Sequence, residues 1–327
     1  MPKVTLANQI HFDCRSEQVI LEAARQHGIA LEHSCRTGRC GVCKAFVASG
    51  ETVALQSEVS LTDQQIAGGY ILTCCRTATT PLLLDIEDLG ELAKLQVRTL
   101  PCRIDRLRLL SNDVLEVTLR TPPASKLKYV PGQYVDMIGR DGLRRSYSIA
   151  NAPREDGNLT LQIRKVTDGE MSHYWFNEAR ANDLLRMEGP FGTFSLRKTN
   201  AKQLILLATG TGIAPIKALL EQLSEYTQHA FSVIHLYWGG RFEEDIYWPP
   251  TFPGLPLQFR PVLSRSPDSA GHKGYVQHAV LKDELNLSAS VVYACGSEAM
   301  INSAYVELVA AGLNSRNFYS DAFVSSN

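Results

Sequence analysis

The chain has 327 residues, of which 44% are hydrophobic and 20% charged, and its formal net charge is −1. The length predicts two or three domains with ordinary globular cores. The near-neutral charge gives no reason to expect nucleic acid or an anionic membrane as a partner. No apolar run approaches the roughly 20 residues of a membrane span, and no signal-peptide stretch opens the chain. We therefore expect a cytoplasmic protein whose eight cysteines serve metal or redox chemistry.

Residues 1–92 are expected to form a first, small mixed domain. "KVTLANQIHFDC" predicts a hairpin, and "SEQVILEAARQHG" predicts a helix with Ser16 as N-cap and Gly28 past its end. After a long cysteine-containing loop, "CKAFVASGETV" predicts a strand and turn, "LTDQQIAGG" a short helix and "PLLLDIED" a strand. "LGELAKLQVRTLP" is interpreted as a linker.

Two further domains follow. Over residues 98–197, short strands separated by Gly, Pro and Asn predict an antiparallel β-barrel. Over residues 200–327, the buried strand of "QLILLATGTGIAPIKALLEQL" leads through a glycine turn into a helix, and further strand and helix patterns alternate after it. That alternation indicates a doubly wound α/β domain.

Four cysteines have the spacing of an iron–sulfur site. Cys35, Cys40 and Cys43 follow a C-x4-C-x2-C pattern, and Cys74 or Cys75 offers the fourth thiol. This is the plant-type [2Fe–2S] arrangement, and thiolates are the soft ligands that such a cluster needs. Zinc is the alternative, but its structural sites usually pair C-x2–4-C units. A Rieske site would need two histidines, and His33 is not at such a position.

Gly38 and Gly41 would let this loop wrap closely and direct backbone N–H groups at sulfur. Successive side chains of an extended segment point to opposite faces, so only one thiol of the adjacent pair faces the cluster. "GYILTC" resembles the GY-x-L-x-C ending of plant-type ferredoxins, which implies Cys74 and a β-grasp fold for the first domain.

"RRSYSIAN" resembles the R-x-Y-S flavin motif of the ferredoxin–NADP reductase family. The resemblance implies FAD, bound by Arg145, Ser146, Tyr147 and Ser148. Arginine can pair with a flavin phosphate, tyrosine can stack on the ring, and Ser148 can reach the N5 edge. "VPGQYV" and "EGPFGTF" stand in the family order around it. A phosphate-binding turn at a helix start is expected at Gly169, Glu170, Met171 and Ser172.

The third domain carries a candidate dinucleotide site. Gly210, Thr211 and Gly212 lie between a strand and a helix, where a pyrophosphate fits, although an ordinary tight turn would look the same. "YACGSEAM" resembles the family's CGP-x-x-M element, with Ser297 in place of Pro. The resemblance implies Cys295 and Gly296 beside the nicotinamide.

Near the end of the chain, Asp321 and Phe323 match the family's carboxylate and flavin-covering aromatic. The alternative for these two residues, and for Cys295, is simple core packing. Arg241, just after a strand, is expected to contact the adenosine side of the dinucleotide.

From end to end the chain resembles the iron–sulfur flavoprotein reductases of this superfamily. The resemblance implies that electrons pass from NADH to FAD, to the [2Fe–2S] cluster and to a partner protein. That partner is a pyridoxamine-phosphate-dependent dehydrase or an oxygenase; the third alternative is a regulatory subunit without turnover. NADPH stays possible, because the order of Ser264, Arg265, Lys273 and Tyr275 is similar to a 2′-phosphate site.

Overall fold

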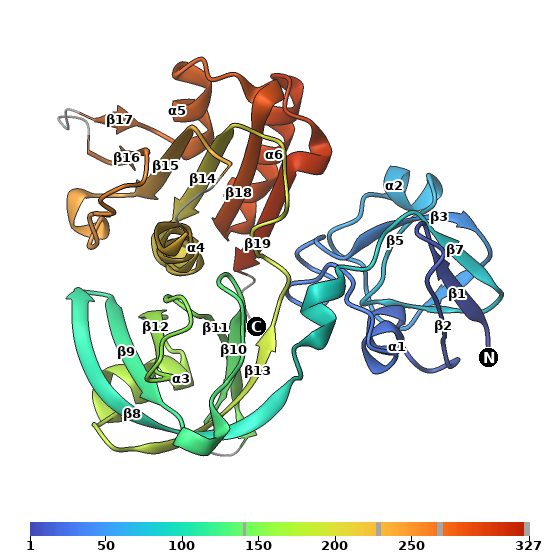
Figure 1. The fold of residues 1–327 in the computed structure, drawn as a ribbon, viewed down its shortest axis with the longest axis horizontal. Coiled ribbons are helices and arrows are strands. Elements are labelled where there is room, and N and C mark those ends of the chain that lie inside the picture. Colours follow the sequence, from blue (N-terminus) through green and yellow to red (C-terminus); the bar gives the residue numbers. More distant parts are fainter. Residues whose placement is uncertain (140–141, 227–229, 267–270, 324–327) are drawn as a thin grey trace. The chain divides into compact units, whose positions relative to one another are not determined.

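The computed structural model describes residues 1–139, 142–226, 230–266 and 271–323 (Figure 1). Contacts divide the chain into two compact units. The first contains residues 1–96 and the last residues from Ala322, and the second contains residues 97–321. Within the described ranges, no helix is both long and apolar enough to cross a membrane.

The first unit is built on a five-stranded sheet in the order β2-β1-β7-β3-β5, beside a separate β4–β6 pair. Its elements are β1 (Lys3–Leu6), β2 (His11–Asp13), α1 (Ile20–Gln26), β3 (Lys44–Ser49), β4 (Thr52–Ala54), α2 (Asp63–Ala67), β5 (Tyr70–Leu72), β6 (Arg76–Ala78) and β7 (Leu82–Leu84). The β1–β2 hairpin is antiparallel, as predicted, while β1 and β7 run parallel. One continuous apolar core fills the space between the sheet and α1.

The two helices of this unit begin differently from each other. α2 starts at a full capping box in which Thr62 and Gln65 satisfy each other's backbone N–H groups. The predicted Ser16 cap of α1 is wrong, because the helix begins at Ile20 after Val19. A turn in which the N–H of Gln18 donates to the carbonyl of Arg15 occupies the residues where the first helical turn was expected.

Residues 98–191 form a six-stranded antiparallel barrel in the order β11-β10-β13-β8-β9-β12. Its strands are β8 (Arg98–Ser111), β9 (Val114–Arg120), β10 (Tyr134–Ile138), β11 (Arg144–Ser148), β12 (Leu159–Arg164) and β13 (Leu184–Phe191). A bridge between Ile149 and Leu161 joins the two edge strands. α3 (Glu170–His173) continues into a π-helical turn (Tyr174–Glu178).

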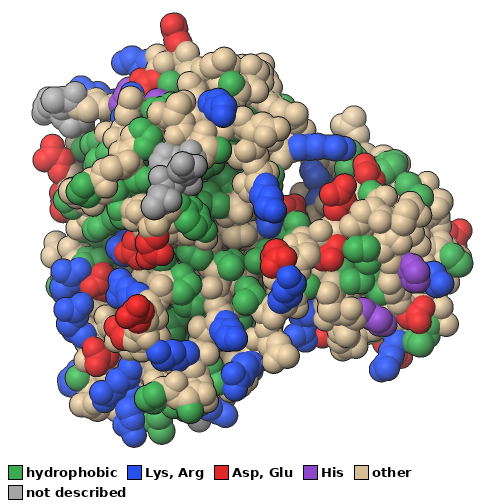
Figure 2. Space-filling view, in the orientation of Figure 1, with side chains coloured by type: hydrophobic (Ala, Val, Ile, Leu, Met, Phe, Trp, Pro, Cys, Tyr) green, Lys and Arg blue, Asp and Glu red, His purple; other side chains and the backbone are tan. Residues whose placement is uncertain are grey.

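β8 shows how the sequence specifies this barrel. Leu100, Cys102 and Ile104 are buried, while the residues between them, Pro101 and Arg103, are exposed. This period of two places one side of the strand in the core and the other in water. Figure 2 shows Lys and Arg side chains gathered over β8 and β9.

Residues 203–323 contain a second six-stranded sheet, in the order β17-β16-β15-β14-β18-β19. Its elements are β14 (Gln203–Thr209), α4 (Ile213–Glu225), β15 (Val233–Gly240), β16 (Leu257–Leu263), β17 (His272–Lys273), α5 (Val276–Lys282), β18 (Ser290–Ser297), α6 (Glu298–Ala310) and β19 (Phe318–Phe323). Strands β14 to β18 run parallel, with β14 between β15 and β18.

Alternate residues of β14 face opposite sides of this sheet. Leu204, Leu206 and Ala208 pack with the apolar face of α4, which covers one side. α5 and α6 contact each other and the sheet from the other side (Figure 1). Short 3-10 helices complete the chain: η1 (Gly90–Lys94), η2 (Pro123–Ser125), η5 (Gly210–Gly212), η6 (Glu243–Asp245), η7 (Leu287–Ala289) and η8 (Ser315–Asn317). The predicted fold class is confirmed; the boundaries 1–92, 98–197 and 200–327 stay predictions.

Candidate functional site

Strand pairing brings Cys43 and Cys74 together. Cys43 directly precedes β3, and Cys74 lies two residues after β5. β3 and β5 pair antiparallel with Lys44 opposite Leu72, so the two cysteines leave the sheet at the same end. Their Sγ atoms are 3.1 Å apart, and both side chains are buried.

Cys35 and Cys40 form a second pair within the preceding loop. The Cys40 thiol donates to Cys35, and hydrogen bonds also come from Thr37; together they lower the pKa of Cys35 to about 5 although burial opposes the shift. The backbone N–H groups of Thr37 and Cys40 each lie 3.4 Å from Cys35 Sγ. Backbone donors therefore point at sulfur in this loop, as the sequence predicted.

The adjacent Cys75 has a different environment from Cys74. Its side chain is fully buried, and its thiol donates to the carbonyl of Ser57 at 3.5 Å. Its Sγ is 3.6 Å from Cys74 Sγ. Cys74 therefore lies beside the predicted ligand Cys43, whereas Cys75 lies between Cys74 and a backbone oxygen. This supports Cys74 as the fourth ligand, which stays a prediction.

The donor set fits a [2Fe–2S] cluster. Four thiols in two pairs match a centre in which two irons share four cysteine ligands. Gly38 has a φ of +75°, and a Cβ there would lie 2.2 Å from the Ser57 carbonyl oxygen, so only glycine fits at this bend. In the parts of the chain that the structure describes, no three His, Cys, Asp or Glu side chains are arranged to hold one metal ion.

β11 carries the predicted flavin motif. Arg145 is half-buried, and its Nη1 donates to the carbonyl of Arg144 at 2.7 Å. The Ser146 hydroxyl donates to Asp136 on the neighbouring strand at 2.6 Å. Ser148, at the end of the strand, is buried. β11 therefore presents the Arg145 guanidinium and the Ser148 hydroxyl from a strand that is held by hydrogen bonds.

Tyr147 is oriented by Trp175. The indole Nε1 donates to the tyrosine Oη at 3.1 Å, and the two rings meet edge to face with centroids 6.2 Å apart. Burial raises the pKa of Tyr147 to about 12, so the phenol is neutral at pH 7. A neutral aromatic ring in a fixed orientation suits stacking on a flavin.

The turn at Gly169–Ser172 is placed at the start of α3. Met171 packs in the barrel core, and the hydroxyl of Ser172 accepts the N–H of Val166 at 2.9 Å. These two side chains therefore serve the fold, while that of Glu170 is exposed. The Ser172 hydroxyl keeps its own proton to donate to a phosphate, whereas Met171 could contact one only through its backbone.

The predicted dinucleotide turn, η5, joins β14 to α4 in very close contact with β18. A Cβ on Gly212 would lie 2.2 Å from the Cys295 carbonyl oxygen, and one on Gly296 would lie 2.0 Å from Thr209 Oγ1. Trp238 Nε1 donates to the Gly210 carbonyl at 3.0 Å. Only glycine fits at positions 212 and 296, so the turn presents backbone at the carboxyl ends of parallel strands, where nucleotides bind.

A cavity of about 420 Å³ opens at this turn, which is within the usual size of ligand pockets. Its lining includes Gly210, Arg241, Ser264 and Tyr275, all of which the sequence singled out. It also includes two barrel residues that sequence reasoning missed, Asp113 and Arg164. These form an ion pair at 2.8 Å, and no local motif marks them.

Cys295 is fully buried on β18, and burial together with the charge of Asp321 raises the pKa of its thiol. Asp321 is itself buried on the neighbouring strand β19, while Phe323 is 39% exposed. Cys295 and Asp321 therefore lie close together. Their roles, and that of Phe323, stay predictions.

Three known families match successive parts of the chain. Residues 4–79 match the 2Fe-2S iron-sulfur cluster binding domain, residues 101–196 the oxidoreductase FAD-binding domain, and residues 206–305 the oxidoreductase NAD-binding domain. The predicted [2Fe–2S], FAD and NAD(P)H are confirmed at the level of these domains. The protein is an oxidoreductase that transfers electrons.

The chain is 41% identical over 324 residues to CDP-6-deoxy-L-threo-D-glycero-4-hexulose-3-dehydrase reductase of Yersinia pestis, covering 97% of this chain and 96% of that one. It is 38% identical to protein RfbI of Salmonella typhimurium, covering 98% and 96%. It is 32% identical to terephthalate 1,2-dioxygenase reductase component 1 of Comamonas, again covering 98% and 96%.

Among solved structures, the cytochrome P450 reductase GcoB of Amycolatopsis matches with a TM-score of 0.76 and 25% identity, covering all of both chains. The similarity to the Yersinia pestis reductase confirms that this chain resembles CDP-6-deoxy-Δ3,4-glucoseen reductase. The segments that carry this resemblance are "ILTCC", "RRSYSIANAP", "YACGS" and "FYSDAF". The chain belongs to the family of NAD(P)H-dependent iron–sulfur flavoprotein reductases that includes these dehydrase and dioxygenase reductases.

Proposed function

We propose that the chain supplies electrons from NADH to a pyridoxamine-phosphate-dependent dehydrase in CDP-dideoxysugar synthesis. The observation that carries this proposal is the end-to-end similarity at 41% identity to reductases named for a CDP-hexulose dehydrase. Identity to the terephthalate dioxygenase reductase is lower, at 32% over a similar length. The sugar intermediate would stay on the dehydrase, so this chain needs no sugar pocket of its own.

The two redox groups that the matched domains imply have complementary chemistry: a flavin takes an electron pair as hydride, and a [2Fe–2S] cluster carries single electrons. We assign Cys35, Cys40, Cys43 and Cys74 as cluster ligands. Their pairing and the N–H groups directed at Cys35 support this assignment. Such N–H groups stabilise negative charge on sulfur and help to set the potential.

On the barrel, we assign Arg145 to a flavin phosphate, Tyr147 to one face of the ring and Ser148 to its reactive edge. The Ser146 hydroxyl stabilises the strand by donating a hydrogen bond to Asp136 on the neighbouring strand. Gly169 to Ser172 would place backbone N–H groups near a phosphate. The neutral, fixed phenol of Tyr147 and the half-buried guanidinium of Arg145 support these roles.

In the third domain, we assign Gly210, Thr211 and Gly212 to the dinucleotide phosphates and Arg241 to the adenosine side. Both Gly210 and Arg241 line the cavity. We assign Cys295, Gly296, Asp321 and Phe323 to the place where nicotinamide meets flavin. We propose NADH as the donor because the family resemblance implies it, and we interpret Arg265 and Lys273, whose side chains are exposed, as solvated loop charges.

The test is acceptor reduction. The protein is reduced anaerobically with NADH and mixed with a pyridoxamine-phosphate-dependent dehydrase loaded with its CDP-sugar intermediate, or with a dioxygenase component. Visible absorbance then reports reoxidation. Rapid reoxidation by the dehydrase alone supports the proposal, and rapid reoxidation by the oxygenase alone overturns it.

The oxygenase alternative rests on the dioxygenase reductases, which align over nearly all of this chain. The regulatory-subunit alternative predicts no steady-state reduction of an artificial acceptor by NADH. We further propose a cytoplasmic location, because thiolate ligands need a reducing compartment and none of the eight cysteines forms a disulfide.

A further inference from the structure

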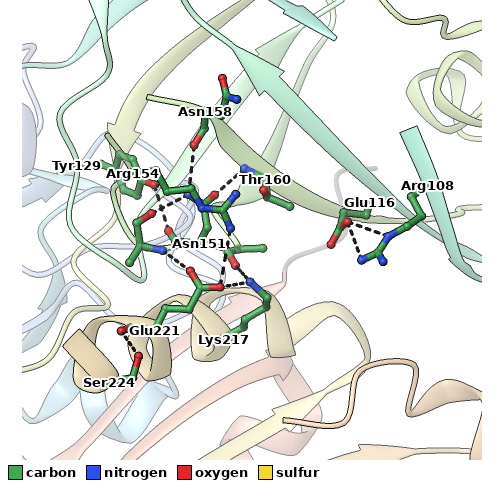
Figure 3. Close-up of polar contacts among 12 residues, drawn as sticks. Arg108, Glu116, Tyr129, Asn151, Arg154, Asn158, Thr160, Lys217, Glu221 and Ser224 are labelled. Carbon is green, nitrogen blue, oxygen red and sulfur yellow. Dashed lines mark hydrogen bonds and ion pairs between the residues drawn. The ribbon is translucent and has the colours of Figure 1, made fainter. Parts of the chain in front are cut away.

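Two charged residues of α4 contact the segment that continues the flavin strand (Figure 3). Lys217 Nζ donates to the carbonyl of Ala150 at 2.9 Å, and the backbone N–H of Ala152 donates to Glu221 Oε2 at 2.9 Å. Lys217 and Glu221 also pair with each other along the helix. We call Lys217 and Glu221 the α4 pair, and residues 149–152 the post-β11 segment.

The post-β11 segment is also hydrogen-bonded to the barrel. Asn151 is fully buried, and its Nδ2 donates to Tyr129 Oη at 3.0 Å and to the carbonyl of Asn158 at 3.2 Å. Its Oδ1 accepts the N–H of Thr160 at 2.6 Å. Figure 3 shows these contacts converging on one side of the segment while the α4 pair reaches it from the helix. A segment that is hydrogen-bonded to both the barrel and α4 moves together with them, so a shift of one element is transmitted to the other.

The α4 pair lies close to the dinucleotide turn. α4 begins at Ile213, directly after Gly212, so Lys217 and Glu221 are roughly 6 and 12 Å along the helix from its start, at about 1.5 Å per residue. The contacted groups of Ala150 and Ala152 lie two and four residues after Ser148. One continuous path of hydrogen bonds and helix thus joins the flavin strand to the phosphate turn.

We propose that Lys217 and Glu221 are positioning residues for hydride transfer, which set the distance between the bound dinucleotide and the flavin. The proposal rests on the proposed roles of Ser148 and of the turn at Gly210–Gly212. Hydride transfer is sensitive to this distance, because a misplacement of about 1 Å can cost about a hundredfold in rate. The α4 pair acts on backbone atoms, so it need touch neither cofactor.

The burial of the pair agrees with this role. The side chains of Lys217 and Glu221 are 12% and 22% exposed, far less than those of ordinary surface ion pairs, which contribute little. Glu221 compensates the charge of Lys217, so the lysine does not present an unbalanced cation to a phosphate. Simple packing is the competing explanation; it predicts a loss of stability with no change in the rate constant of hydride transfer.

The experiment compares Glu221→Ala, Glu221→Gln and the control Ser224→Ala. Ser224 lies on the same helix, and its hydroxyl donates to the backbone carbonyl of Glu221 at 2.7 Å. Anaerobic stopped-flow measurements give the limiting rate constant of flavin reduction and the apparent Kd for NADH. Fluorescence gives the Kd for FAD, and hydrogen exchange reports the amide of Ala152 independently of activity.

We expect Glu221→Ala to lower the limiting rate constant about tenfold or more, to leave both Kd values within about threefold and to speed exchange at Ala152. Glu221→Gln keeps an oxygen that can accept the Ala152 N–H, so it should restore most of the rate. Ser224→Ala should match the wild type. Lys217→Met, which keeps the apolar stem, should slow reduction in the same manner.

A wild-type limiting rate constant in Glu221→Ala, with exchange at Ala152 increased, would overturn the proposal. So would a rate loss that appears equally in Ser224→Ala. If Glu221→Ala does not retain FAD, Lys217→Met and Glu221→Gln decide the question by the same criteria. Failure of the proposed function would show differently, as a reduced chain that no dehydrase reoxidises while flavin reduction itself is normal.

Discussion

Replacing Gly38 with Ala should destabilise the cluster domain more than the same change at Gly41. Both glycines have a φ of +75°, which costs an L-residue about 1–2 kcal/mol. They differ in the space around a new Cβ. At position 38 it would lie 2.2 Å from the Ser57 carbonyl oxygen and 2.8 Å from Cys75 Sγ, whereas at position 41 the nearest atom is Ser60 Oγ at 3.4 Å.

The magnitude follows from that difference. A carbon–oxygen contact is normally about 3.3–3.6 Å, so the backbone at Ser57 or the cluster loop must move by about 1 Å. Overpacking of this kind costs about 1–3 kcal/mol. The free energy of unfolding should therefore fall by about 2–5 kcal/mol in Gly38→Ala and by about 1–2 kcal/mol in Gly41→Ala.

The assay is urea unfolding of the intact holoprotein, followed by the visible circular dichroism of the cluster, with iron content measured at the start. Gly41→Ala is the matched control, because it carries the backbone strain without the clash. Equal midpoints for the two variants would refute the steric argument. A wild-type midpoint for Gly38→Ala would also refute the positive φ on which it rests.

Cys74→Ser should damage the cluster more than Cys75→Ser, because Cys74 Sγ approaches Cys43; equal loss of cluster absorbance would reverse the choice of ligand. Cys35→Ser should leave flavin reduction by NADH intact and stop one-electron delivery to the partner, and a folded variant without flavin reduction would contradict the modular arrangement. Chemical analysis should find about two irons and two sulfides per FAD, and zinc in place of iron would refute the cluster. The ratio kcat/KM should favour NADH; a tenfold NADPH preference that disappears in Arg265→Ala would overturn that assignment.

Much of the fold could be predicted because its determinants are local. The alternation in β8, the capping box at Thr62 and the apolar run of β14 each depend on neighbouring residues. The start of α1 could not be predicted from Ser16, because the competing turn at Arg15 receives a hydrogen bond from Thr77, which is distant in sequence.

The candidate site also has parts that depend on the local sequence and parts that depend on contacts between residues distant in the sequence. Spacing and glycine placement predicted the ligand thiols and the dinucleotide turn. The ion pair of Asp113 with Arg164 at the cavity, and the contact of Glu221 with Ala152, join residues about 50 and 70 positions apart. No pattern within either segment marks the other, so only the folded chain shows that they meet.

The two predicted thiol pairs differ in what positions them. The pairing of β3 with β5 brings Cys43 and Cys74 together. Cys35 and Cys40 depend on a loop, and ordering each loop residue costs about 1–2 kcal/mol. For the four predicted ligands, the entropy cost of ordering the site therefore falls mainly on the loop that carries Cys35 and Cys40.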